Sequence, residues 1–328
     1  MTTKTNSQKI LPFLAQTTIA NQVKFVTENN NYIIYKIVRP DSASIKPRID
    51  FGKSIGLVTS YLDRSEVMPG DHIQTTFYLQ AIDSLDKNLR VLVRLIGRQG
   101  EVLRVQGWQK ESPTLNWQLN NVWLDSHELA LPADTPPGYY RIELSFYESD
   151  TLMALPVTDS WADLPLGDTY TVGYLVVGNP KHRPANPFTS PTDLGSSIRL
   201  LGTTIGKDNG VAMGKERKLK IDLFWQSLIP VDTNYTVFVH LVAANGQLVS
   251  QQDQEPLGGF FPTSSWPAGQ TIADEYELLL PTDLPAGTYE LRVGMYNLIT
   301  GQRLPVSQDG QVIGDYVTVE TIPIELTP

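Results

Sequence analysis

The residue types that most often carry chemistry are few in this chain and widely spaced. Its 328 residues include no cysteine, which excludes disulfides, thiolate metal sites and cysteine nucleophiles. No histidine lies at a zinc-like spacing from another or beside a carboxylate cluster. There is no glycine-rich phosphate loop and no Gly-x-Ser-x-Gly elbow. The four histidines are His72, His127, His182 and His240.

Carboxylates are plentiful, and a glycosidase needs only two that face each other. Asp134 and Asp283 lie in a corner rich in Pro and Gly, where an aspartate that caps a turn is the simpler interpretation. Asp168 and Asp315 follow a glycine in a turn and are interpreted in the same way. A calcium ion in such a turn and a converging acid pair stay open as alternatives. The sequence favours a protein that is not an enzyme and has no cofactor or metal.

Aromatic side chains form the remaining candidate site, because their rings can stack on a sugar face or on a partner's apolar patch. The chain contains two internal repeats, described below, and an aromatic residue present in only one of them is a candidate for an exposed surface. Phe260 and Phe261, which follow Gly258-Gly259, are such a pair. The alternative for this pair is that both rings fold back over the end of the core. The candidates are Trp108, Trp123, Trp161, Phe260 and Phe261.

A tandem repeat must position these residues. Residues 131–140 align with residues 280–289 without a gap, with Leu, Pro, Asp, Pro, Gly and Tyr at the same places and a constant offset (287 − 138 = 149). Collinear matches extend through both halves of the chain. Self-similarity at a domain-sized period indicates two copies of one fold, and the matches place them at 49–177 and 193–323.

Within each copy the hydrophobic pattern has a period of two. Leu219, Ile221, Leu223 and Trp225 are an example, and such alternation predicts strands with one face on a core. The 23 Pro and 24 Gly residues are typical of a turn-rich β protein. The predicted fold is all-β, with two tandem immunoglobulin/fibronectin-III-like Greek-key sandwiches of seven strands each. In the second copy the strands are expected at 198–204, 219–226, 235–243, 248–253, 275–280, 288–297 and 316–322.

The Leu-Pro-x-Asp-x-Pro-x-Gly-x-Tyr motif has a structural interpretation. Proline restricts the backbone before a corner, and Gly138 or Gly287 lets the chain turn into a strand. Tyr140 and Tyr289 are then placed to lay their rings on the core and return a hydrogen bond to the corner, as in a tyrosine corner. The equivalent Trp117 and Trp266 are expected to close one end of each core. Each of these six residues is predicted to have a structural role.

The remaining segments connect or flank the two copies. Residues 1–22 are predicted to be a flexible tail, with a cleaved signal as the alternative because Lys4 and Lys9 precede a short apolar run. Residues 23–48 are expected to form a β-ribbon around an Asn-rich turn. Four prolines in 178–192 indicate an extended linker, and 324–328 are expected to be a tail.

Charge and hydropathy exclude some partners. The net charge of −9 argues against nucleic acid or anionic lipid as a main partner, because both select basic surfaces. No apolar run approaches the roughly 18 residues that cross a bilayer as a helix. The oligomeric state is not indicated by the sequence.

A set of motifs runs through the second copy: Phe224-Trp225-Gln226, residues 232–241, Pro262-Thr263-Ser264-Ser265-Trp266-Pro267-Ala268-Gly269, residues 280–289 and Gly301-Gln302-Arg303-Leu304-Pro305. This set resembles the soluble β-sandwich module that follows the membrane portion of many bacterial glycosyltransferase-like proteins, notably from filamentous phototrophs. The first copy resembles it more loosely, because Phe77-Tyr78-Leu79-Gln80 and Arg94 depart from the pattern. The resemblance implies a noncatalytic accessory domain of the cell envelope, and it transfers no catalytic residue.

Two function classes follow. The favoured hypothesis is a noncatalytic tandem sandwich on the extracytoplasmic or cell-surface side, with the cytoplasm as the alternative location, that binds a glycan or an envelope protein. The other hypothesis is a structural subunit that docks through sheet edges or an apolar face and has no small ligand.

Overall fold

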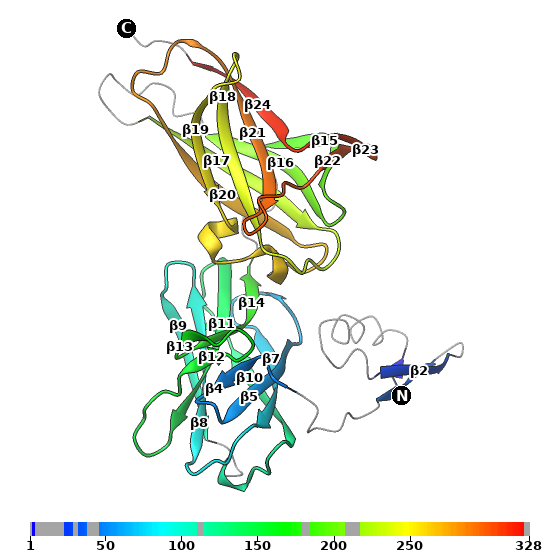
Figure 1. The fold of residues 1–328 in the computed structure, drawn as a ribbon, viewed down its shortest axis with the longest axis vertical. Coiled ribbons are helices and arrows are strands. Elements are labelled where there is room, and N and C mark those ends of the chain that lie inside the picture. The colour runs from blue at the N-terminus through cyan, green and yellow to red at the C-terminus, as the bar shows by residue number, and fades with distance from the viewer. Residues whose placement is uncertain are drawn as a thin grey trace. The chain divides into compact units, whose positions relative to one another are not determined.

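In the computed structural model of the protein, the described residues are 2–3, 23–28, 32–37, 46–109, 114–178, 184–206 and 217–324. The chain divides into two compact units, residues 1–178 and 179–328 (Figure 1). Over the described residues the regular structure consists of β-strands and three short 3-10 turns. None of them belongs to a helix long and apolar enough to span a bilayer. The predicted all-β sandwich fold is confirmed.

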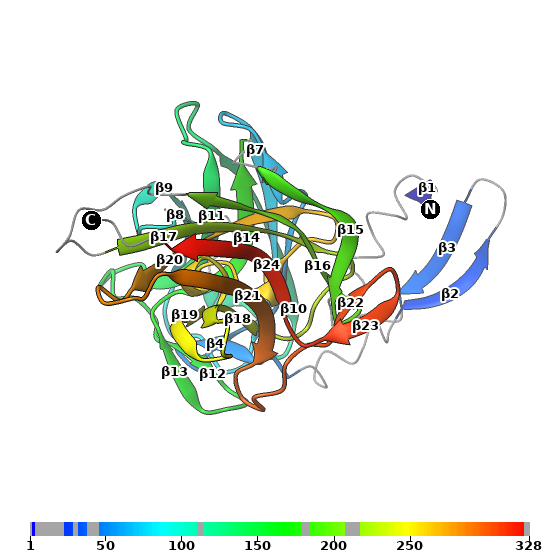
Figure 2. The same cartoon turned by 90° about the horizontal axis from the view of Figure 1, so that it is seen from above.

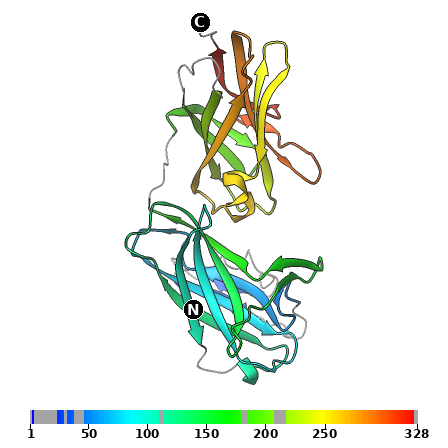
Figure 3. The same cartoon turned by 90° about the vertical axis from the view of Figure 1, so that its left-hand side faces the viewer.

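The first unit packs a six-stranded sheet, in the order β10-β7-β5-β4-β12-β13, on a five-stranded sheet, in the order β6-β14-β11-β8-β9 (Figure 3). All neighbours are antiparallel except β6 and β14, which run parallel. The strands are β4 Ile49–Phe51, β5 Ile55–Leu62, β6 Glu66–Val67, β7 His72–Ala81, β8 Leu89–Gly97, β9 Val102–Gln109, β10 Val122–Ala130, β11 Gly138–Glu148, β12 Val157–Asp159, β13 Leu164–Gly167 and β14 Tyr170–Val177.

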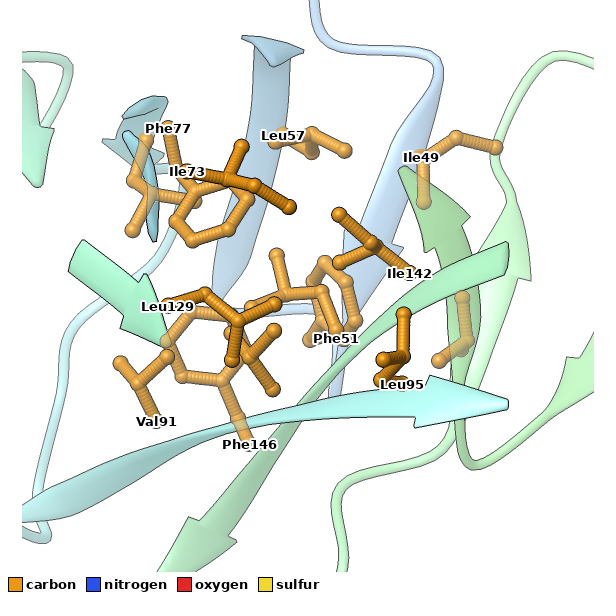
Figure 4. Packing of buried hydrophobic residues seen from close by; sticks show 14 of the residues in the cluster. Ile49, Phe51, Leu57, Ile73, Phe77, Val91, Leu95, Leu129, Ile142 and Phe146 are labelled. Atoms are coloured by element: carbon orange, nitrogen blue, oxygen red, sulfur yellow. The ribbon is translucent and has the colours of Figure 1, made fainter. Parts of the chain in front are cut away.

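The core of this unit is built from alternate residues of both sheets (Figure 4). On β8, Val91, Val93 and Leu95 are buried, because successive side chains of a strand point to opposite faces. Phe51 and Phe146 meet edge to face, with ring centroids 4.9 Å apart. The period-two pattern of the sequence therefore marks the inward face correctly.

The second unit repeats this arrangement with a six-stranded sheet, β20-β17-β16-β15-β22-β23, and a four-stranded sheet, β19-β18-β21-β24 (Figures 1 and 2). Two 3-10 turns, Pro256–Gly259 and Thr263–Ser265, join β19 to β20. The strands are β15 Asn186–Leu194, β16 Ile198–Gly206, β17 Arg217–Ser227, β18 Tyr235–Ala243, β19 Leu248–Gln254, β20 Thr271–Leu280, β21 Gly287–Asn297, β22 Val306–Gln308, β23 Gln311–Gly314 and β24 Val317–Ile324.

These sheets contain more strands than the seven predicted for each copy. All seven strands expected in the second copy are present, but β15, β22 and β23 were not expected. The hairpin β22–β23 is too short to show a period-two pattern, and its two strands hold three and four residues. The prolines of β15 indicated a linker instead of a strand, because proline cannot donate to a β-ladder.

The predicted linker over 178–192 is therefore too long. Asn186 and Pro187 pair with β16, a register shift follows, and pairing resumes at Thr192. The shift accommodates Pro191, which cannot donate to a ladder. Opposite Pro187 lies Gly202, with φ of +151°, where a Cβ would overlap the Asn186 carbonyl oxygen. Only glycine admits that approach. Pro187 and Pro191 therefore lie in a kinked strand, while residues 179–183 lie outside the described residues.

The amino-terminal segment forms a separate three-stranded sheet in the order β1-β3-β2, with β1 Thr2–Thr3, β2 Val23–Glu28 and β3 Tyr32–Ile37. The antiparallel pair β2–β3 lies where the sequence indicates a ribbon. β1 falls within the segment expected to be a tail. Ile324, expected to begin the carboxyl-terminal tail, is the last residue of β24. Residues 1, 4–22 and 325–328, the rest of both predicted tails, lie outside the described residues.

Both corner tyrosines make the hydrogen bond that their motif predicts. The Tyr140 hydroxyl donates to the Pro136 carbonyl oxygen at 2.7 Å, and the Tyr289 hydroxyl donates to the Pro285 carbonyl oxygen at 2.8 Å. Both rings are buried. Each tyrosine therefore joins the corner before its strand to the core beneath it.

Tyr289→Phe is expected to lower the free energy of unfolding by about 1 kcal/mol, because it removes one buried hydrogen bond. Tyr289→Ala removes the packed ring as well and is expected to cost about 3 kcal/mol. Calorimetry of the full chain measures both, and Tyr140→Phe provides the matched change in the first unit. Melting of both Tyr289 variants together with wild type would contradict a structural role for this corner.

Candidate functional site

The phenylalanine pair proposed as an exposed surface is buried. Phe260 is 8% exposed and Phe261 is 1% exposed, so the hypothesis of an open aromatic loop is corrected in favour of its alternative. The loop folds back through its two 3-10 turns, and the Trp266 indole N–H donates to the Phe261 carbonyl oxygen at 2.9 Å. Gly258 and Gly259, with positive φ, permit this tight path.

The three candidate tryptophans of the first unit have different surroundings. Trp123 stacks on Trp117, with ring centroids 5.4 Å apart, and packs against the core, so it belongs to the closed end of the sandwich rather than to a ligand surface. Trp161 is 67% exposed, and the Arg48 guanidinium lies 5.9 Å from its ring centroid. The Trp108 backbone pairs with Val91, and its side chain lies outside the described part. Trp161 alone of the three is shown on the surface.

A different group of side chains gathers on the outer face of the sheet β19-β18-β21-β24. On β18 the inward residues Val237, Val239 and Leu241 are buried in the core, so Phe238 and His240 point to the opposite face. His240 Nε2 lies 3.1 Å from Asp253 Oδ1. The Phe238 ring lies 4.7 Å from the His240 ring, measured between centroids.

Strand β21 completes this group with Tyr296, whose ring centroid is 6.4 Å from that of Phe238. Partial burial, together with the nearby Asp253 carboxylate, raises the pKa of the Tyr296 hydroxyl. It therefore stays a neutral hydrogen-bond donor and acceptor. Asp253 is thus flanked by His240 and Tyr296 across three neighbouring strands.

Two arginines cover the aromatic rings of this face. Arg303 lies over Phe238, with its guanidinium carbon 4.2 Å from the ring centroid, and its Nη1 is 3.5 Å from Asp315 Oδ2. Arg292 lies over Tyr316 at 4.6 Å and pairs with Glu290 at 2.8 Å. Planar guanidinium groups stack well on aromatic rings and keep their N–H groups available at the edges.

A hollow of about 350 Å³ adjoins this group at Tyr316. Its lining mixes apolar side chains with hydrogen-bonding groups. The lining residues are Gln308, Ile313, Gly314, Tyr316, Val317 and Thr318. We refer to this hollow together with Phe238, His240, Asp253, Arg292, Tyr296, Arg303 and Asp315 as the outer-face site.

Most residues of the outer-face site are particular to the second copy. The strand pairings fix the equivalent positions: Leu92 faces Gly107 where Phe238 faces Asp253, and Arg94 faces Glu143 where His240 faces Arg292. Likewise, the isolated bridge of Tyr147 with Ala154 matches that of Tyr296 with Arg303. Of these positions only the tyrosine is shared between the copies.

In the first copy the same place holds an ion cluster. Glu143 accepts from Arg94 at 2.9 Å and lies 2.8 Å from the Arg141 Nε atom, with its side chain 8% exposed. Such a cluster satisfies its own charges and is typical of a structural role. The two copies therefore share a fold but present different chemistry on this face.

Sequence reasoning missed the outer-face site for an identifiable reason. Its residues differ between the copies, with His240 in the place of Arg94, Asp253 in that of Gly107 and Arg303 in that of Ala154. His240 and Asp253 are polar residues on strands, where alternation alone indicates a solvated face. Arg303 lies in the connection between β21 and β22.

A second missed feature lies inside both cores. Asp125 and Asp274 occupy the same position of their copies (274 − 125 = 149) and are buried. Asp274 accepts from the Leu257 N–H at 2.7 Å and from the Tyr276 hydroxyl at 2.6 Å. Burial, and then the Asp274 charge, raise the pKa of Tyr276 well above its ordinary value. In the first copy His127 Nε2 lies 2.8 Å from Asp125 Oδ1.

The other sequence candidates are dispersed. Within the described ranges no group of three or more His, Asp or Glu side chains could hold a metal ion. His72 pairs with Glu128 at 2.8 Å on an exposed strand face. Asp315 belongs to the outer-face site, while Asp134, Asp168 and Asp283 are separate from it, and His182 lies outside the described residues.

Comparisons with known proteins do not assign the chain to a family. No family model matches the chain, and no curated protein matches it in sequence. A solved structure of the C-terminal domain of Wzt aligns with 10% identity and a TM-score of 0.28, covering 43% of this chain and 86% of that one. Trypsin-activated alpha-2-macroglobulin from Escherichia coli aligns with 12% identity and a TM-score of 0.25. That alignment covers 88% of this chain but only 17% of the macroglobulin.

Gly294→Ala is expected to disturb the outer-face site directly. A Cβ at this position would overlap the Phe238 ring and lie 2.9 Å from the Asp315 carbonyl oxygen. The overpacking is expected to cost about 2 kcal/mol, measured by thermal unfolding, and to displace Phe238 from beneath Arg303. Ser145→Gly, the converse change at the equivalent position, is the control in the first unit. A Gly294→Ala variant as stable as wild type would show that the ring is not held against this backbone.

Proposed function

We propose that the chain is a noncatalytic binding module of the cell envelope, and that its second sandwich holds the ligand on the outer-face site. The observation that carries the proposal is the concentration of His240, Asp253 and Arg303, each without a counterpart in the first copy, around the shared Tyr296 on one sheet face, beside a hollow. Duplicated copies share the requirements of the fold, so chemistry confined to one copy is where a specific function is expected.

The composition of the site favours binding over catalysis. His240 and Asp253 are adjacent, as in many acid–base pairs, but a reaction is helped by an enclosed place for the reacting atoms. The hollow of this site is open, because its lining residues Ile313, Gly314 and Thr318 are exposed.

Phe238 is 1% exposed beneath Arg303 and offers no ring surface to a ligand. The partly exposed rings of Tyr296 and Tyr316, bordered by hydrogen-bonding groups, suit a polar ligand that has apolar faces, such as a glycan or a protein loop.

The envelope location rests on the resemblance of the second copy to the module that accompanies bacterial membrane glycosyltransferase-like proteins. The extracytoplasmic or cell-surface side is proposed, with the cytoplasm as the alternative. Protease treatment of intact cells tests this location, since a surface module is degraded while a cytoplasmic marker protein survives. Full protection in intact cells, followed by digestion after lysis, would contradict it.

Binding is tested by retention of the purified chain on polysaccharide isolated from the envelope of the source cells. Wild type is expected to be retained, and the His240→Ala, Asp253→Ala double variant to be retained about tenfold less, because it removes the central hydrogen-bonding pair. Trp161→Ala is the control, since it removes an exposed ring in the other unit. Equal retention of the double variant and wild type, or release of new reducing ends, would overturn the proposal.

A structural subunit is the second candidate function, and one observation favours it. The edge strands β13 and β23 are exposed over their whole length in both copies, and they carry Leu164, Leu166, Val312 and Ile313 on the surface. Exposed apolar edges are frequent docking points. Photo-crosslinking from positions 166 and 312 in the source cells is expected to yield one protein adduct if this function is correct.

A further inference from the structure

The acidic side chains in and beside the outer-face site are already paired with donors. Asp253 meets His240, Asp315 meets Arg303, and Glu290, next to the site, meets Arg292. An anionic ligand that bound either arginine would lie close to the carboxylate already paired with that arginine, so two negative groups would repel each other. The chain's net charge of −9 opposes such a ligand further.

An uncharged ligand with many hydroxyl groups meets no such penalty. A hydroxyl both donates and accepts, a guanidinium only donates, and a carboxylate only accepts. Two neighbouring hydroxyls can therefore bind beside the pair, one accepting from Arg303 and the other donating to Asp315. Both side chains are partly exposed, and their Nη1–Oδ2 distance of 3.5 Å is long for a hydrogen bond, so each keeps hydrogen-bonding capacity for a ligand.

The hollow beside the Arg303–Asp315 pair provides further contacts for a sugar ring. Tyr316 and Ile313 provide apolar surface for the C–H face of a ring, while Gln308 and Thr318 provide polar groups. Its volume of about 350 Å³ lies at the lower end of the roughly 300–1,000 Å³ found for ligand sites. That size suits a small polar ring better than an extended apolar chain.

We propose that the outer-face site binds an uncharged pyranose sugar, with its ring in the hollow against Tyr316 and two neighbouring hydroxyls on the Arg303–Asp315 pair. This inference rests on the proposed function and narrows its ligand to neutral glycans. Glycans that carry uronate or phosphate groups are excluded as main ligands by the carboxylates Asp315 and Glu290.

The test is calorimetric titration of the full chain with neutral glucan and mannan tetrasaccharides and, in parallel, with tetragalacturonate. Neutral probes are expected to bind with Kd below about 1 mM. Tyr316→Ala and Asp315→Asn are each expected to weaken that binding by about tenfold while leaving the melting temperature unchanged. The matched controls are Thr169→Ala and Asp168→Asn, the same positions of the first copy, which are expected to have no effect.

The outcomes separate this inference from the function on which it rests. Binding of a neutral probe that is lost in both outer-face variants supports both. Binding of tetragalacturonate in preference, lost in the same variants, overturns the neutral-sugar inference and keeps a binding module on this face. Binding of neutral probes that is unaffected by both variants, or no binding of any probe, overturns the inference. In that case retention on envelope polysaccharide decides the proposed function separately.

Discussion

Replacing Phe260 and Phe261 together by alanine is expected to lower the free energy of unfolding of the second unit by about 5 kcal/mol or more. Both rings are buried, and removal of one buried phenylalanine typically costs about 3–5 kcal/mol through lost burial and the cavity left behind. The two effects will not add fully, because neighbouring residues share the same cavity. In a scan of the full chain, the transition of the second unit is expected to fall by about 15 °C.

The same double variant separates two roles of this loop. A ligand-binding loop would lose retention on envelope polysaccharide without losing stability, whereas a structural loop would lose stability. Retention measured well below the lowered transition is expected to equal that of wild type, because the outer-face site is built on β18, β21 and neighbouring strands. Unchanged melting would show that the two rings do not contribute to the core.

The fold could be predicted from the sequence largely because it occurs twice. The matched corner motifs indicated where Tyr140 and Tyr289 enter β11 and β21, and alternation indicated the buried face of β18. The pattern was insufficient for β15, where prolines suggested a linker. Pairing of β15 with β16 and β22 depends on Gly202 and on a register shift, and neither can be read from one strand alone.

The candidate site was predicted less well, because the sequence does not show which side chains share a face. Phe238, Asp253 and Arg303 are distant in the chain and meet only when β18 pairs with β19 and β21 pairs with the segment at Arg303. The sequence made Phe260 and Phe261 candidates for an exposed surface, because they lie in a loop with two glycines and have no counterpart in the first copy. Their burial depends on contacts that local sequence does not reveal, including the anchoring of that loop by Asp274.

Replacing Asp274 by alanine is therefore expected to cost about 4 kcal/mol and to release the loop at 255–266. The carboxylate accepts from the Leu257 N–H and the Tyr276 hydroxyl, and each buried donor left without a partner costs about 1–3 kcal/mol. Leu257 also has φ of +55°, which is strained for a leucine. Without its acceptor, that conformation loses the contact that maintains it.

Thermal unfolding and hydrogen exchange together test this role. Asp274→Asn keeps one acceptor oxygen and is expected to cost about half as much as alanine, while exchange of the Leu257 amide is expected to accelerate most in Asp274→Ala. Asp315→Asn, an exposed acid of the same unit, provides the control. If Asp274→Ala melts with wild type and its Leu257 amide stays protected, the loop is held by its apolar contacts alone. The aspartate shared with the first copy would then need another explanation, which the same change at Asp125 would address.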